Sequence, residues 1–229
     1  MLNKISQSCL GSLFIYTFIS LLNFGVEVKA ETIDIEPKII QESPTLEKWL
    51  QKIPNVLDEI NNEPSFNTHL RLGYLYSPSN SDKLGIGVGI DDLFVGKSSL
   101  TLTGDYQTSF SGIDYSTGLN AQFYLLPLGY VVNVAPVVGY RSLGINQYNT
   151  QGLNLGGRVK LILSRNNSAD ISFTQTFVNL GNSDEVGISI LSTGYAITSN
   201  FRISAEIQQE NSKVHKDSHV GIFLEWILK

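Results

Sequence analysis

The sequence predicts an all-β fold: an antiparallel, up-and-down transmembrane β-barrel of about ten strands, preceded by a short amphipathic helix. Three observations lead to this prediction. Polar and apolar residues alternate along nearly the whole chain after residue 66, in runs of about nine to twelve residues. Short segments rich in Gly, Asn, Ser and Asp separate the runs. The N-terminal residues have the character of an export signal.

Residues 1–30 are predicted to be a signal peptide. Lys4 lies in a short n-region, residues 10–24 are mostly apolar, and residues 28–30 (Val-Lys-Ala) fit a small-residue cleavage site. The apolar run is too short to span a bilayer comfortably. The single cysteine, Cys9, lies within this segment, so the mature chain is expected to lack disulfides, thiol chemistry and cysteine-bound metals.

Length and composition limit the number of domains and the class of partner. A length of 229 residues favours one domain. The net charge of −5 comes from mixed signs without a basic run, which argues against a nucleic-acid partner. A hydrophobic content of 42% and a mean hydropathy of +0.02 would suit an ordinary soluble protein, because averages do not register alternation.

Residues 31–66 form a different N-terminal segment, with an amphipathic helix predicted over 44–60. Ser43 and Pro44 suit the N-cap and first helical position, and Pro54 is expected to kink the helix. Its apolar residues recur at helical spacing: Leu46, Trp49, Leu50, Ile53, Val56, Leu57 and Ile60. The helix would cover one end of the domain, lie on a membrane surface or dock an unknown partner.

The barrel is predicted over residues 67–229. Its strands are expected at 67–76, 83–91, 98–107, 113–125, 131–142, 152–163, 170–178, 186–197, 201–210 and 217–227. An even number of antiparallel strands places both ends of the barrel chain on the same side. Three local irregularities are predicted: a bulge or gap at Pro136, a bulge where the apolar phase changes between Ile190 and Leu191, and a polar Gln175 among lipid-facing residues.

Alternation alone does not say which face of the sheet lies inside. A soluble barrel has an apolar interior, whereas a membrane barrel has the reverse. Strand lengths close to those that cross a bilayer, an even strand number and aromatic residues near strand ends favour the membrane barrel. The predicted lumen then carries a network of charges of both signs: Arg71, Asp105, Asp114, Arg141, Arg158, Lys160, Arg202, Glu206 and Glu225. In a narrow lumen these charges are expected to pair, and Gly85, Gly87 and Gly89 would leave room for Tyr124 or Arg71, or for a small passage.

The final strand contains "HVGIFLEW", residues 219–226. This stretch resembles the C-terminal assembly signal of bacterial outer-membrane β-barrel proteins, with His219 at the polar position, Gly221 at the glycine, and Leu224 and Trp226 as the final pair. Three more residues follow Trp226, where many members of that family stop. The resemblance covers residues 67–229 and implies a lipid bilayer and the outer-membrane assembly machinery as partners, with location in the outer membrane. It also implies that both ends of the barrel, and with them the segment 31–66, lie in the periplasm.

Enzyme activity, a metal site and a cofactor are not predicted. The mature chain would hold three histidines: His69, His215 and His219. Asp217, Ser218 and His219 are the one cluster typical of a hydrolase, but Ser218 and His219 should point to opposite faces of a strand. Asp91 and Asp92 are interpreted as a turn that ends a strand rather than as a catalytic pair.

Three functions follow from these observations. The first is an outer-membrane barrel with a structural or interaction role and a largely side-chain-filled lumen. The second is a narrow pore for small solutes, and the third is a soluble periplasmic barrel that binds an apolar ligand. Fractionation with membranes would separate the third from the others, and conductance would separate the first two.

Overall fold

The computed structural model describes residues 63–79, 83–145, 148–164, 168–213 and 216–228. The predicted signal peptide, the predicted helix over 44–60 and His215 lie outside the described residues. Within the described ranges, no helix is long and apolar enough to cross a membrane.

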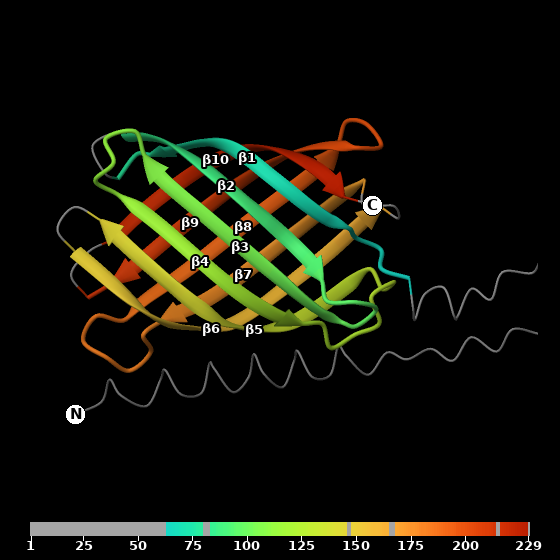
Figure 1. Cartoon of the computed structure of the whole chain (residues 1–229), viewed down its shortest axis with the longest axis horizontal. Helices are drawn as coiled ribbons and strands as arrows, with labels where there is room; N and C mark the ends of the chain where they lie inside the picture. The colour runs from blue at the N-terminus through green and yellow to red at the C-terminus, as the bar shows by residue number, and fades with distance from the viewer. Residues whose placement is uncertain (1–62, 80–82, 146–147, 165–167, 214–215, 229) are drawn as a thin grey trace, which may run out of the picture. The chain divides into compact units, whose positions relative to one another are not determined.

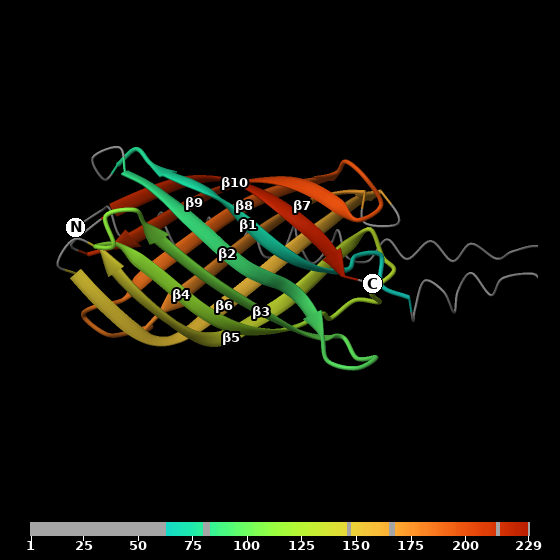
Figure 2. The ribbon, with the colours of Figure 1, turned by 45° about the horizontal axis from the view of Figure 1, so that its top comes forward.

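The described strands close into a ten-stranded antiparallel barrel, as Figures 1 and 2 show. Each strand pairs with its neighbours in sequence, and β1 pairs with β10 to close the ring. We call the end where β1 begins and β10 finishes the terminal end, and the opposite end the distal end. The strands are β1 (Thr68–Ser77), β2 (Lys83–Phe94), β3 (Leu100–Ser109), β4 (Tyr115–Phe123), β5 (Val132–Ile145), β6 (Tyr148–Ser164), β7 (Ala169–Val178), β8 (Val186–Ala196), β9 (Phe201–Ser212) and β10 (Lys216–Leu228).

Alternation in sequence becomes an apolar exterior and a polar interior. Strand β9 alternates almost perfectly: Ile203 and Ile207 are 44% and 50% exposed, whereas Arg202 and Glu206 are buried. Successive side chains of a strand point to opposite faces of the sheet. The direction of one side chain therefore determines the direction of every other side chain in that strand. The predicted face assignment is confirmed, because the predicted outward apolar residues are exposed or half-buried and the predicted inward polar residues are buried or half-buried.

Strand β8 contains no bulge, so the prediction of one between Ile190 and Leu191 is wrong. Its pairing with both β7 and β9 runs without a register shift. The apparent change of phase arises because the inward positions near the distal end are themselves apolar. Four buried residues form a cluster there: Leu143, Val178, Val186 and Ile188.

Pro136 causes a gap rather than a bulge. The β5–β6 pairing passes through Pro136 without a shift. On the other side, the β4–β5 ladder ends one pair earlier, at Gln122 and Val137. Proline lacks the N–H that the ladder would need. The backbone N–H of Leu125 donates to the Val134 carbonyl at 2.9 Å, beyond the gap.

Residues 143–151, which separate the predicted strands 131–142 and 152–163, belong largely to strands in the structure. β5 continues to Ile145 and β6 starts at Tyr148, because Leu143 and Thr150 keep the inward alternation. The loop over 179–185 is tied to this hairpin: the Tyr148 hydroxyl donates to the Asp184 carbonyl at 2.8 Å. Hydrogen bonds from Asn179 and Thr150 hold the pKa of the Asp184 carboxyl below its usual range.

Glycines make room for one large aromatic side chain inside the barrel. Phe223 of β10 is fully buried, and a Cβ built at Gly73, Gly87 or Gly221 would come within 3 Å of its ring. The Arg71 guanidinium lies 3.9 Å from the centre of the same ring. Of the two side chains predicted to use the space along β2, Arg71 does so beside Gly89, while Tyr124 lies at the terminal end. The burial of the Phe223 ring inside the barrel was not predicted from the sequence.

Candidate functional site in the barrel lumen

Aromatic and aliphatic side chains fill the terminal end of the lumen. Phe66, which precedes β1, is fully buried, with its ring centre 4.9 Å from that of Tyr124 and 5.4 Å from that of Phe94. The Ser65 N–H and hydroxyl both bond to the Leu128 carbonyl, at 3.0 and 2.8 Å, and hold this segment in place. The apolar cluster comprises Phe66, Tyr124, Leu128, Ala135 and Ile162. We call this cluster the terminal plug.

Beneath the terminal plug lies a buried ion cluster centred on Asp92. Its carboxylate accepts hydrogen bonds from Lys160 Nζ at 2.6 Å and the Tyr124 hydroxyl at 2.7 Å. The Arg158 guanidinium is 3.6 Å away. Lys160 Nζ also lies 4.4 Å from the Phe66 ring centre. The cluster therefore binds the plug to the barrel wall by a charge and by a cation–π contact.

A bulge in β2 creates this position. The β2–β3 register shifts between Ile90 and Leu93, and Asp92 takes a positive φ of 52°. Because a bulge adds a residue to one strand, both Asp91 and Asp92 can turn inward. The prediction that this pair forms a turn ending the strand is therefore wrong, since β2 continues to Phe94.

The ion cluster continues around the wall through Asp170. Its carboxylate contacts Lys160 at 3.3 Å and pairs with Arg202. Arg202 Nε lies 3.0 Å from Glu225. The contacts connect β2, β6, β7, β9 and β10, so one chain of alternating charges crosses half of the barrel wall.

Two further groups of charges lie nearer the middle. Arg71 contacts Glu206 at 2.5 Å and Asp91 at 3.1 Å. Arg141 contacts Asp105 at 2.5 Å. Because the buried charges of opposite sign are in contact, their attraction offsets part of the free-energy cost of removing them from water.

All nine charges predicted for the lumen form ion pairs, but they fall into separate groups. Asp114 differs from the rest, because it pairs with Lys83 near the distal mouth at 2.6 Å. Sequence reasoning missed three of the acidic partners: Asp91, Asp92 and Asp170. Asp91 and Asp92 were missed because the bulge in β2 interrupts the alternation on which the assignment of inward residues depends. Asp170 could have been found by extending the alternation of β7, whose inward positions also include Ser172 and Thr176.

A polar cavity of about 70 Å³ lies between these layers. Asp105, Gln122, Arg141 and Arg158 are among the residues that line it. A cavity of this volume and polarity has room for several water molecules. It is too small for an organic solute, whose binding pockets typically exceed about 300 Å³.

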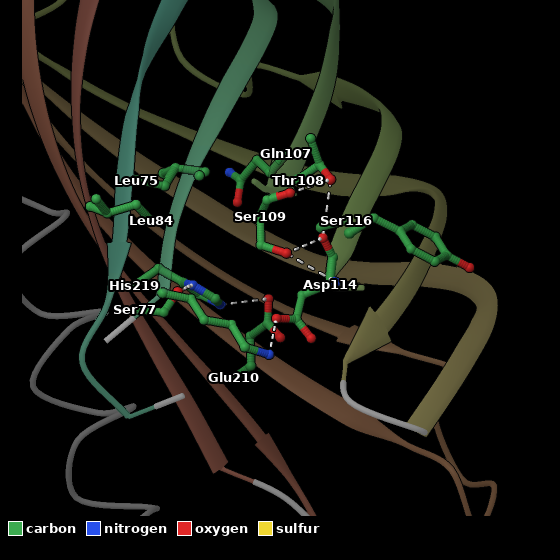
Figure 3. A pocket seen from close by; sticks show the side chains of 13 residues that line it. Leu75, Ser77, Leu84, Gln107, Thr108, Ser109, Asp114, Ser116, Glu210 and His219 are labelled. Atoms are coloured by element: carbon green, nitrogen blue, oxygen red, sulfur yellow. Dashed lines mark hydrogen bonds and ion pairs between the residues drawn. The ribbon is translucent and has the colours of Figure 1, made fainter. Parts of the chain in front are cut away.

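A second cavity, of about 40 Å³, lies toward the distal mouth (Figure 3). The Ser77 hydroxyl and His219 Nδ1 share a hydrogen bond of 2.5 Å, and His219 Nε2 is 3.5 Å from Asp217 and 3.8 Å from Glu210. Both carboxylates lie beyond hydrogen-bonding range of the imidazole, so they do not orient it as the acid of a catalytic triad does. Gln107 lines both cavities.

The Ser218 backbone N–H donates to Asp217 Oδ1 at 2.8 Å, but its hydroxyl points away from His219. The inward positions of β10 include Asp217 and His219, whereas Ser218 lies on the outward side, as predicted from strand geometry. Among the described residues, no group of histidine, cysteine and acidic side chains has the arrangement of a metal site.

The residues of the predicted assembly signal divide between the two faces of β10. His219 and Gly221 face the lumen, and Leu224 and Trp226 are exposed on the outer face. Trp226 packs against Phe201 of β9, with ring centres 5.5 Å apart. Because β10 pairs with β9 and β1, this stretch forms one side of the seam that closes the barrel.

A closed sheet without free edges, an apolar outer face and a charged lumen define a transmembrane β-barrel. No protein-family model matches the sequence, and no curated protein matches it.

The chain is similar to solved structures at low sequence identity, with TM-scores below 0.5. The KdgM porin is 10% identical, with 70% of this chain and 99% of that chain covered and a TM-score of 0.42. The N-terminal β-barrel domain of Pseudomonas aeruginosa OprF is 12% identical, with 71% and 98% covered and a TM-score of 0.34. The Acinetobacter baumannii outer membrane protein Omp33 is 12% identical, with 71% and 98% covered and a TM-score of 0.35. The class of this chain rests on its own barrel geometry.

Proposed function

We propose that the chain is a small outer-membrane β-barrel with a structural or interaction role and a lumen closed to solutes. The observation that carries this proposal is the filling of the terminal end. Phe66 is fully buried against Tyr124 and Phe94, directly above the Asp92–Lys160 pair. An ion crossing the lumen would have to displace both an apolar layer and a buried ion cluster.

The arrangement of the lumen charges supports the same function. Ion-selective pores use rings of like charge or of backbone carbonyls. In this lumen, Lys160, Arg202 and Arg71 each touch at least one carboxylate within 3.3 Å. Paired charges hold the wall together and do not form a ring of one sign.

The outer-membrane location is supported by the apolar outer face and by the resemblance of residues 219–226 to the assembly signal. A soluble barrel that binds an apolar ligand is disfavoured, because such a barrel needs an apolar lumen. Cell fractionation tests the location: the protein should be recovered with outer membranes and resist extraction by alkaline carbonate.

Conductance of purified protein in a planar bilayer tests the closed lumen. We expect no steady conductance above the bare membrane, while a porin reconstituted in the same way provides the positive control. Reproducible single-channel steps from the wild-type protein would refute the closed lumen.

A narrow pore is the second candidate, favoured by the two cavities that share Gln107. They approach one another from the distal mouth to the middle, which leaves the terminal plug as the main obstacle. If the wild type conducts, Phe66→Ala should increase its conductance. Under the closed-lumen proposal Phe66→Ala admits at most brief openings, since Asp92 and Lys160 still occupy the lumen.

A further inference from the structure

One row of residues on the outer face of the barrel lacks apolar side chains. Gly157 pairs with Gln175, Gln175 with Ser189, and Ser189 with Gln209, across strands β6 to β9. Residues paired in this way stand side by side on the same face of a sheet. The row runs across the yellow to orange-red strands of Figure 1. We call Gly157, Gln175 and Ser189 the polar row.

Gln175 lies within the apolar band, and the polar row reaches the distal edge of that band at Ser189, because Gly187 is the remaining outward residue of β8 on that side. Phe173 and Phe177 flank Gln175 on β7 and are 47% and 36% exposed. Leu191, which follows Ser189 on the outer face of β8, is 47% exposed. On β6, the outward residues on either side of Gly157 are Leu153 and Leu155, and Val159, Leu161 and Leu163. A side-chain amide at this level of the barrel faces lipid and not water.

The polar row leaves hydrogen-bonding capacity unused. The Ser189 hydroxyl donates to Gln175 Oε1 at 2.5 Å. Gln175 Nε2 donates to the Thr176 carbonyl at an N···O distance of 3.4 Å, which is long for a hydrogen bond. Hydrocarbon cannot complete these bonds, and an under-bonded polar group in an apolar medium is costly. A partner that supplied an acceptor and a donor at the same depth would remove this cost.

We propose that the polar row is the contact through which two copies of this chain associate in the membrane. Two barrels inserted in the same direction hold Gln175 at the same depth, so a two-fold axis along the membrane normal brings the two amides together. An amide carries both donors and an acceptor, so it is complementary to its own copy, as a two-fold contact requires.

Gly157 allows the close approach that this contact needs. It lacks a side chain, and a Cβ built there would meet only the Ala135 carbonyl, at 3.8 Å. The backbone of β6 is therefore uncovered beside Gln175, and a neighbouring barrel can come close to the amide. Close approach between small residues and hydrogen bonds between polar ones are the main sources of association between protein segments in lipid.

The proposal rests on insertion into a membrane, so the experiment measures insertion separately. Wild-type protein and the double variant Gln175→Leu/Ser189→Leu are labelled with donor and acceptor dyes and refolded into phospholipid vesicles. Energy transfer is followed over a range of protein-to-lipid ratios. The double variant should need at least about tenfold more protein per lipid for half-maximal transfer, the effect of losing roughly one or two hydrogen bonds in lipid.

Thr117→Leu is the matched control. It replaces a polar residue by leucine on the outer face of β4, away from the polar row, and should leave the association curve unchanged. All three leucines face lipid, so the variants should fold at least as well as the wild type. Flotation of the vesicles reports insertion, as does the fluorescence of Trp226 in a chain that carries Trp49→Phe.

Disulfide trapping gives a second test in a chain whose natural cysteine is removed by Cys9→Ser. Ser189→Cys should cross-link to a dimer under mild oxidation in vesicles, and Leu119→Cys on β4 should not. Equal cross-linking of both, an unchanged curve for the double variant, or an inserted wild type that remains monomeric would overturn the dimer. In cells, a cross-link of Ser189→Cys to a different protein would also overturn it. Failure of insertion would overturn the proposed function itself.

Discussion

Replacing Asp92 by Asn tests the ion cluster beneath the terminal plug. Coulomb's law with an effective dielectric constant of about 20 gives roughly 6 kcal/mol at 2.6 Å, the Asp92–Lys160 distance, and roughly 5 kcal/mol at 3.6 Å, the distance to Arg158. Desolvation offsets part of this attraction, and Lys160 keeps Asp170 at 3.3 Å. Leaving a buried charge unpaired typically costs about 3–5 kcal/mol, and we expect Asp92→Asn to fall in that range.

The assay is urea unfolding of the refolded barrel in phospholipid vesicles, followed by the fluorescence of Trp226 in a chain whose other tryptophan is replaced by Trp49→Phe. Arg158→Met in the Asp92→Asn background should restore at least about 2 kcal/mol, because Asp92 is the carboxylate that Arg158 contacts and the methionine removes the charge left without it. Glu63→Gln, at an exposed position before β1, is the control and should change stability by less than about 0.5 kcal/mol. A cost below about 1 kcal/mol for Asp92→Asn, or no coupling between the two substitutions, would refute the reasoning.

Two further predictions concern the two faces of the wall. Val134→Arg places a charge on the lipid face and should cost about 2–4 kcal/mol in the same assay, whereas Asn133→Ser, at the adjacent inward position, should cost less; similar losses would mean that the faces are misassigned. Phe223→Ala empties the space over Gly73, Gly87 and Gly221 and should cost about 3–5 kcal/mol, while Gly221→Val should destabilise through the clash with the Phe223 ring. A stable Gly221→Val barrel that refolds normally would contradict the role given to this ring.

The strand positions and faces could be predicted because they depend on local pattern. A period of two is a property of the extended chain itself, and only one phase of it places apolar residues on a common face. Prediction failed where inward and outward residues were both apolar. At Ile188 and Ile190 the inward wall is apolar, and the sequence there imitates a bulge that does not exist.

The site was harder to predict than the wall. Arg202 and Glu225 could be assigned to the lumen because each falls on the inward side of the alternation in its strand. The pairing of β9 with β10 then places the two residues directly opposite one another. Asp92 could not, because its inward direction depends on a bulge and a positive φ that the sequence does not mark. The dimer contact is an intermediate case: Gln175 was recognised as an unusual residue on the lipid face, but its alignment with Gly157 and Ser189 is known only from the register.

The sequence by itself determined the strand number and the direction of each face, since both are set by residue type and spacing along one strand. Only the tertiary structure decided which charges meet and what closes the lumen. Lys160 and Asp92 are far apart in the chain and belong to strands that are not adjacent in the barrel. Their contact, and the position of Phe66 above them, depend on the closure of the sheet, which brings opposite walls within reach of their side chains.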